Sequence, residues 1–221
     1  MTDYKIRIGG EVRDRLLATP NAFRIPSNDL DIFVVRGFLA QAECDRLIRL
    51  IDANRIPSQL LSATTDPEFR TSESCNLDPD EPIVERVEAK IAALLGIDPD
   101  RGETIQGQRY AVGQQFKPHH DFFHPAEPYW PEMERTGGQR TWTAMIFLNA
   151  AEEGGHTFFE HVGIKIAPKA GNLLAWNNLD AIGEPNFHSI HQGMPVTAGV
   201  KYIITKWHRE RPWLPTDIQT Y

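Results

Sequence analysis

Two short segments contain residues with the chemistry of metal ligands. His119 and Asp121 stand two apart in RYAVGQQFKPHHDFF, and His188 and His191 follow in HSIHQGMPV. On a β-strand, residues two apart point to the same face, so one imidazole nitrogen and one carboxylate oxygen can meet a single ion. Either downstream histidine can supply a third ligand, and the residues alone leave that choice open.

Two histidines and one carboxylate are typical of non-haem Fe(II) sites, because they leave three coordination positions open. Zinc would more often complete a closed tetrahedral shell. The alternative is a hydrogen-bonded surface pair, since a His-X-Asp sequence arises easily in a chain with eight histidines. The choice depends on the residues around the pair.

Lys201 is a candidate partner for an acid bound at this site. It follows His191 by ten residues, within the alternating stretch VKYIITKW. If that strand turns Lys201 inward, its ammonium needs an anion, and the carboxylate of a bound acid would supply one. The alternative is that Lys201 faces solvent.

The elements that must position these residues are helices first and strands later. Apolar residues recur at helical spacing over 44–51 and 83–95, with Asp80 as the expected N-cap of the second helix and Gly96 as its end. From about Thr104 onward, short β-rich runs lie between Gly, Pro and Asn turns. We expect these strands at 141–148, 164–166, 172–176 and 200–207. The pattern predicts an α+β protein whose helices brace a β-sandwich or barrel.

The remaining segments suggest a simple domain organisation. Residues 1–30 are polar and interrupted by Pro20 and Pro26, so we expect an adaptable lead-in there, followed by one domain over 31–215. The interval 122–140 is too long for a hairpin turn, and its aromatic residues and Gly137-Gly138 pair predict a lid or binding loop.

Composition excludes several classes of protein. The 221 residues are 41% hydrophobic and 24% charged, as in ordinary globular proteins, and the net charge is -7 without a basic run. Nucleic acid is therefore not expected as a partner. Cys44 and Cys75 form no CxxC pair, which argues against disulfides and thiolate metal sites. With no long apolar segment, we expect no membrane association and a cytoplasmic location.

Four ordered blocks resemble the prolyl 4-hydroxylase family of 2-oxoglutarate/Fe(II) dioxygenases. They are FRTSESCNLDP, RYAVGQQFKPHHDFF, RTWTAMIFLNAAEEGGHTFFE and HSIHQGMPVTAGVKYIITKWHRE, and the resemblance runs over roughly residues 30–210. It implies a double-stranded β-helix, or jelly roll, with its core at about 104–210. It also implies hydroxylation of a peptidyl proline with release of succinate and CO2.

The resemblance implies roles for individual residues. It assigns three iron ligands: His119, Asp121 and His191. It makes Lys201 the anchor of the C5 carboxylate of 2-oxoglutarate, with three companions: Tyr110, Thr157 and Trp207. The implied cofactors are Fe(II), 2-oxoglutarate and O2, with L-ascorbate as the reductant.

Substrate contacts are expected from Arg140, Tyr129 and Trp130, because aromatic-lined grooves bind extended proline-rich segments. The alternative is that these rings pack the loop onto the barrel. The expected partner is a protein or peptide that contains proline, with a free amino acid or other small molecule as the rival substrate. A nucleic-acid demethylase is disfavoured, because that branch has an arginine where this chain has Lys201. A jelly-roll module that binds metal or ligand without turnover is the rival from another class.

Overall fold

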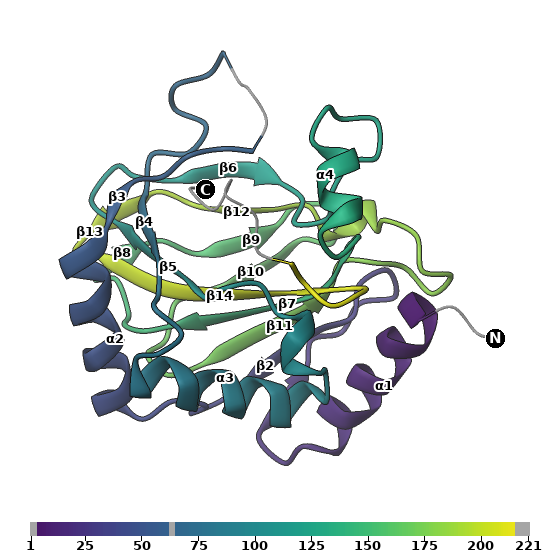
Figure 1. The fold of residues 1–221 in the computed structure, drawn as a ribbon. Helices are drawn as coiled ribbons and strands as arrows, with labels where there is room; N and C mark the ends of the chain where they lie inside the picture. The colour runs from purple at the N-terminus through teal and green to yellow at the C-terminus, as the bar shows by residue number, and fades with distance from the viewer. Residues whose placement is uncertain (1–3, 62–64, 215–221) are drawn as a thin grey trace.

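Two antiparallel β-sheets face each other, and helices cover the outer face of the larger one (Figure 1). This computed structural model describes residues 4–61 and 65–214. The larger sheet has eight strands, in the order β1 (Ala22–Arg24), β2 (Ile32–Val35), β11 (Leu173–Asn177), β7 (Arg140–Phe147), β14 (Lys201–Arg209), β5 (Gln106–Tyr110), β4 (Glu73–Asn76) and β3 (Ile56–Pro57). The smaller sheet has four, in the order β10 (Ile164–Ile166), β9 (Thr157–Phe159), β12 (His191–Gly193) and β6 (Phe116–His119). A separate pair is formed by β8 (Glu153–Gly154) and β13 (Val196–Ala198).

Three helices line the outer face of the larger sheet, namely α1 (Tyr4–Ala18), α2 (Gln41–Asn54) and α3 (Pro82–Leu95) (Figure 1). The short helix α4 (Trp130–Arg135) stands apart from them, and 3-10 turns occur at Pro99–Arg101 and Phe187–Ser189. Within the described residues, no helix is long and apolar enough to cross a lipid bilayer. The predicted α+β class, a jelly roll braced by N-terminal helices, is confirmed.

Strand β7 shows how the sequence separates the two faces of the larger sheet. Trp142, Ala144 and Ile146 belong to the core cluster under the helices, whereas Met145 and Phe147 belong to the cluster between the sheets. Since alternate residues of a strand point to opposite faces, Thr141 and Thr143 lie on the inner face as well. The space between the sheets therefore receives polar side chains beside apolar ones.

The predicted helices and strands agree closely with the structure. The two amphipathic patterns form α2 and α3, and the four later strand predictions match β7, β10, β11 and β14 to within two residues. Helix α3 ends where Gly96 takes the left-handed conformation, with φ of 71°. Its N-cap is Glu81 and not Asp80, because Pro82 fits the first helical position and fixes where the helix begins.

The prediction of an adaptable lead-in over residues 1–30 is wrong for Tyr4–Ala18. These residues form α1, which buries Ile8, Val12 and Leu16 in the same core as α2 and α3. The four-residue spacing of these side chains gives a narrow apolar stripe, and the charges and Gly9-Gly10 between them conceal it in the sequence. Helix α1 is therefore part of the packed core.

Adjacent leucines in α1 provide a direct test of this packing. Leu16 is fully buried, whereas Leu17 is 57% exposed. We expect Leu16→Ala to lower the free energy of unfolding by about 2–5 kcal/mol, because it removes buried methyl groups and leaves a cavity. Leu17→Ala should change it by less than about 0.5 kcal/mol. Chemical denaturation of both variants measures the difference, and equal losses would show that α1 does not stabilise the core.

Candidate active site

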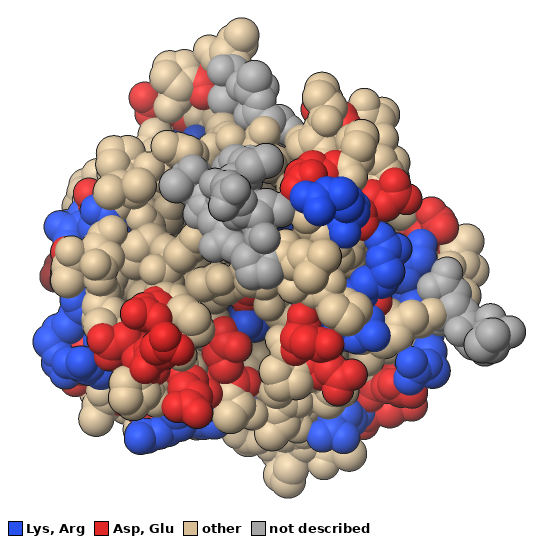
Figure 2. Space-filling view, viewed as in Figure 1, with Lys and Arg blue, Asp and Glu red and all other residues tan. Residues whose placement is uncertain are grey.

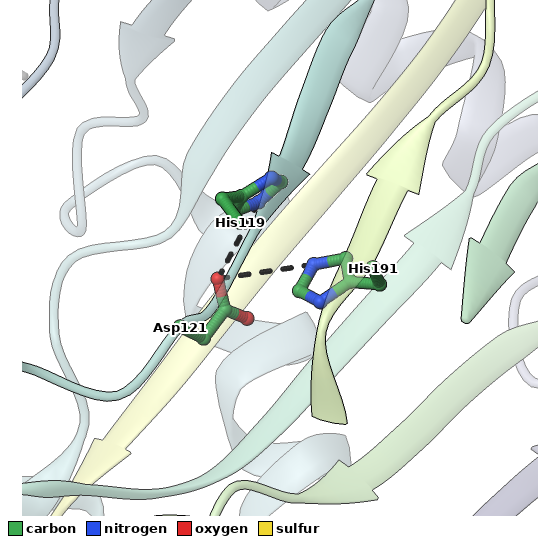
Figure 3. A group of neighbouring side chains, drawn as sticks. All are labelled: His119, Asp121 and His191. Carbon is green, nitrogen blue, oxygen red and sulfur yellow. Dashed lines mark ion pairs between the residues drawn. The ribbon is translucent and has the colours of Figure 1, made fainter. Parts of the chain in front are cut away.

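The three predicted metal ligands converge at one end of the smaller sheet. Strand β6 ends on His119, β12 begins at His191, and the antiparallel register places these two residues directly opposite each other. Asp121 lies in a bend two residues beyond β6, and its Oδ1 is 3.9 Å from Nε2 of His119 and 4.0 Å from Nε2 of His191 (Figure 3). The bend, and not strand alternation, therefore brings Asp121 to the histidines. One potential ligand atom from each residue lies within 4.8 Å of the others.

Backbone carbonyl groups fix the orientation of both imidazole rings. The Nδ1 atom of His119 lies 2.8 Å from the carbonyl oxygen of Lys117, and that of His191 lies 3.0 Å from the carbonyl oxygen of Ser189. A carbonyl can only accept, so each Nδ1 carries the hydrogen and each Nε2 keeps its lone pair toward Asp121. Burial lowers the pKa of His119 to about 3, which keeps its ring neutral and able to bind a metal.

Two side chains behind Asp121 hold its carboxylate in place. The Thr143 hydroxyl donates to Oδ2 of Asp121 at 2.8 Å, and Nδ2 of Asn178 donates to the Thr143 hydroxyl at 2.9 Å. Burial acts to raise the pKa of Asp121, but His191, His119, Arg140 and the Thr143 hydrogen bond together outweigh it, and the pKa is lowered. An ionised carboxylate beside two imidazole nitrogens fits Fe(II) chemistry. Sequence periodicity could place Thr143 on the inner face, but it could not identify its partner.

His188, the alternative third ligand, lies elsewhere. Its side chain is exposed, and its ring is 6.0 Å from that of His161. The ring of His191, in contrast, is 4.4 Å from that of His119 and packs against Trp176. The geometry therefore selects His191 for the cluster.

Lys201 points inward, as predicted. It is 1% exposed, and it opens β14 opposite Tyr110 of β5. Its Nζ lies 5.0 Å from the ring centroid of Tyr110 and 5.8 Å from that of Phe147, with no carboxylate or hydrogen-bond acceptor as partner in the described part of the chain. Burial lowers the pKa of Lys201 to about 7. Such an ammonium is poised to accept an anion from outside the chain.

Comparison with known proteins gives the family. Residues 105–209 match the model of the 2OG-Fe(II) oxygenase superfamily. A protein of Acanthamoeba polyphaga mimivirus, which is named as a prolyl 4-hydroxylase, is 31% identical over 180 residues. The match covers 81% of this chain and 74% of that protein. The chain belongs to the prolyl 4-hydroxylase family.

Two further relatives show the extent of the similarity. Human prolyl 4-hydroxylase subunit alpha-1 is 34% identical over 75% of this chain, but the match spans only 30% of the human subunit. The 2OG complex of the viral collagen prolyl hydroxylase of Paramecium Bursaria Chlorella virus-1 superposes with a TM-score of 0.65 at 28% identity. That superposition covers 80% of this chain and 95% of the viral one. Both the sequence and the fold therefore place the chain among the prolyl 4-hydroxylases.

In this family member, a cavity of about 660 Å³ connects the metal cluster to Lys201. Tyr110, Thr157 and Trp207, the predicted companions of 2-oxoglutarate, all line it. The Tyr110 hydroxyl donates to Oε1 of Gln108 at 2.7 Å. The Thr157 hydroxyl and the Trp207 indole nitrogen are buried without a hydrogen-bond partner among the described residues. Such unsatisfied groups are expected where a polar ligand binds.

The predicted substrate contacts are only partly brought together. Arg140 and Tyr129 line the cavity of this prolyl 4-hydroxylase family member, but Trp130 does not. Arg140 is held by Glu103, whose two carboxylate oxygens accept from Nε at 2.6 Å and from Nη2 at 2.7 Å. The guanidinium lies 4.1 Å from the ring centroid of Trp207. Arg140 is thus a fixed part of the wall.

The segment 122–140 is not a continuous loop, because α4 occupies its centre. Trp130 opens this helix and Pro131 follows in its first turn, where proline is well tolerated. The Tyr129 hydroxyl accepts a hydrogen bond from the His124 backbone N–H at 3.1 Å, and it secures the entry to the helix. Whether this segment moves as a lid stays a prediction.

Two cavity residues were given no role from the sequence. Glu103 accepts hydrogen bonds from both Arg140 and Arg209. Arg70, in the FRTSES block, forms a β-bridge with Phe116 of β6 and lines the cavity. Arg70 falls in a block that resembles the family, which was the available signal. Glu103 had no such signal, since its partners lie 37 and 106 residues away in the chain.

Proposed function

We propose that this protein hydroxylates a peptidyl proline to 4-hydroxyproline, using Fe(II), O2 and 2-oxoglutarate and releasing succinate and CO2. The observation that carries the proposal is the cavity that joins the His119, Asp121 and His191 cluster to the buried ammonium of Lys201. A prolyl 4-hydroxylase family member needs both features, because the cosubstrate must reach the metal with one end and an anchoring cation with the other.

In this proposal His119, Asp121 and His191 hold the iron, which supplies the oxidation of the C–H bond when it is bound with 2-oxoglutarate and O2. Lys201 pairs with the C5 carboxylate of 2-oxoglutarate, and its burial strengthens that pair because little water competes for the ammonium. Three residues complete the cosubstrate site: Tyr110, Thr157 and Trp207. The aromatic walls exclude water from the reacting centre.

A proline-containing peptide is the proposed substrate, and the names of the relatives support that choice. We propose that Arg140 and Tyr129, which line the cavity, contact this peptide, and that Trp130 contacts only a peptide that extends beyond the cavity. We propose L-ascorbate as the reductant, a cytoplasmic location and no nucleic-acid partner. The single dioxygenase domain expected over 31–215 is extended in this proposal to include α1, which packs in the same core. A free amino acid is the rival substrate.

The proposal is tested by incubating the protein with proline-containing peptides, Fe(II), ascorbate and 2-oxoglutarate. We expect hydroxyproline and succinate in equal amounts, and neither product when Fe(II) or 2-oxoglutarate is omitted. A module that only binds metal and ligand would bind both without releasing succinate. Turnover of a free amino acid with no reaction of any peptide would favour the rival substrate.

Binding of 2-oxoglutarate should take up protons in mildly alkaline solution. Burial lowers the pKa of Lys201 to about 7, so the free ammonium is mostly deprotonated at a higher pH, and pairing with a carboxylate raises the pKa again. At a pH of about 8 we therefore expect up to about one proton taken up per 2-oxoglutarate bound. Calorimetry in buffers of different ionisation enthalpy measures this uptake. Lys201→Met should remove it, and its absence in the unaltered protein would contradict the pairing.

A further inference from the structure

The cavity is positively charged although the chain carries a net charge of -7. Among residues 4–61 and 65–214, four cationic side chains line it against two carboxylates, a net charge of +2: Arg70, Arg140, Lys201 and Arg209, against Glu103 and Asp121. The outer face seen in Figure 2 instead mixes acidic and basic side chains. Fe(II) and the 2-oxoglutarate dianion of the proposed function cancel each other, so their binding leaves the positive charge of the cavity in place.

Arg70 is the cavity cation that forms no direct ion pair with a carboxylate among the described residues, although the charge of Asp121 acts favourably on it. Arg140 and Arg209 share Glu103, at 2.6 and 3.0 Å, and Lys201 has the proposed cosubstrate. Within the part of the chain that the structure describes, Arg70 donates only to neutral oxygens, from Nη1 to the carbonyl of Gln59 at 2.9 Å and from Nη2 to Oε1 of Gln106 at 2.8 Å.

A further donor of Arg70 is also unused. The Nε of Arg70 is buried without a hydrogen-bond partner in residues 4–61 and 65–214. Burial lowers the pKa of this guanidinium, which reflects the cost of holding its charge away from water. A cation in this position gains most from an anion that enters the cavity.

The position of Arg70 separates it from the cosubstrate anchor and brings it near the metal cluster. Its guanidinium carbon lies 4.8 Å from the ring centroid of Phe116, and that ring stacks on His119 at 3.6 Å. Its Nη2 donates to Gln106, whereas Lys201 lies opposite Tyr110 in the sheet, and the backbones of Gln106 and Tyr110 are four residues, roughly 13 Å, apart along β5. When 2-oxoglutarate extends from the metal to Lys201, Arg70 stays available to bind a different ligand.

We propose that Arg70 binds a carboxylate of the substrate, so that the preferred substrate is a peptide with Glu or Asp next to the target proline. This inference rests on the proposed function. A carboxylate matches the planar fork of the guanidinium and neutralises its charge, whereas a peptide carbonyl would leave the charge unpaired. The α-carboxylate of a free amino acid offers the same chemistry from a second source.

The first test compares matched peptides on the unaltered protein. Each pair carries Glu or Gln next to the proline, on one side or the other, and free L-proline is assayed in parallel. We expect a KM about ten- to a hundredfold lower for the Glu member of at least one pair, since a charge-assisted contact is lost in the Gln member. The KM for 2-oxoglutarate should be the same with both.

The second test removes the cation. Arg70→Gln should abolish the preference for Glu over Gln by raising the KM of the Glu peptide to that of the Gln peptide, and Arg70→Lys should keep part of the preference. Calorimetric binding of the two peptides should show the same pattern without turnover. Arg135→Gln is the matched control, because Arg135 is exposed on α4, pairs with Glu132 and does not line the cavity. It should retain the full preference.

The outcomes distinguish this inference from the proposed function. Hydroxylation of both members of every pair with equal KM would overturn the role of Arg70 and leave prolyl hydroxylation standing. A preference that survives Arg70→Gln would overturn it too. Hydroxylation of free L-proline but of no peptide would overturn the proposed function and the peptide substrate together.

Discussion

Replacing Asp121 by alanine should abolish both Fe(II) binding and succinate release. Oδ1 of Asp121 is the atom that faces the Nε2 atoms of His119 and His191, and its carboxylate supplies the only negative charge of the cluster. Loss of an outer-shell partner of a metal ligand costs roughly 10–100-fold in affinity or activity. Loss of the ligand itself should therefore exceed about a hundredfold. Fe(II) titration and succinate release in Asp121→Ala measure the two effects.

Neighbouring residues give matched comparisons for this prediction. Thr143→Ala removes the hydrogen bond to Oδ2 of Asp121 but keeps the ligand itself. It should lower Fe(II) affinity and succinate release by roughly 10–100-fold, less than Asp121→Ala does. His188→Ala alters an exposed histidine three positions before His191 and should keep activity, whereas His191→Ala should lose it. The opposite result for the two histidines would show that the distal ligand is His188.

Lys201→Ala should raise the KM for 2-oxoglutarate by about ten- to a hundredfold and leave Fe(II) affinity nearly unchanged. A charge-assisted hydrogen bond contributes roughly 1.5–3 kcal/mol, which converts to that range. Lys201→Arg should also be impaired, because the guanidinium is larger and planar and the ammonium is confined between the rings of Tyr110 and Phe147.

Lys206 is a suitable control for this prediction. It is buried on the same strand, but its Nζ donates to Glu88 at 2.6 Å and it does not line the cavity. Lys206→Met should lower stability without changing the KM for 2-oxoglutarate. If Lys201→Ala left the 2-oxoglutarate titration unchanged, Lys201 would have no place in the cosubstrate site.

The parts of the fold that the sequence predicted are those governed by local periodicity. Helices α2 and α3 have broad apolar stripes, and Gly96 ends α3 because it accepts a positive φ. Helix α1 escaped detection because its apolar stripe is one residue wide, with a buried side chain only at every fourth position. Helix α4 escaped because six residues are too few to show a period.

The site shows where local patterns cease to be informative. The residues left His188 and His191 equivalent, and the choice comes from a register that pairs His191 with His119 across two strands far apart in the chain. The resemblance to the family anticipated that choice. The hydrogen bonds that link Asn178, Thr143 and Asp121 could not be predicted from the sequence. These residues meet only because β7 and β11 lie side by side in the sheet.

Mass spectrometry of the product formed under isotopically labelled O2 tests the central claim most directly. The protein is incubated with Fe(II), ascorbate, 2-oxoglutarate and proline-containing peptides, including those with an adjacent Glu. We expect one labelled oxygen on C4 of the proline and one in succinate, in equal amounts, and no product from Asp121→Ala. Labelled succinate with the peptide unmodified, or labelled oxygen on a free small molecule instead of a peptidyl proline, would contradict prolyl hydroxylation by this protein.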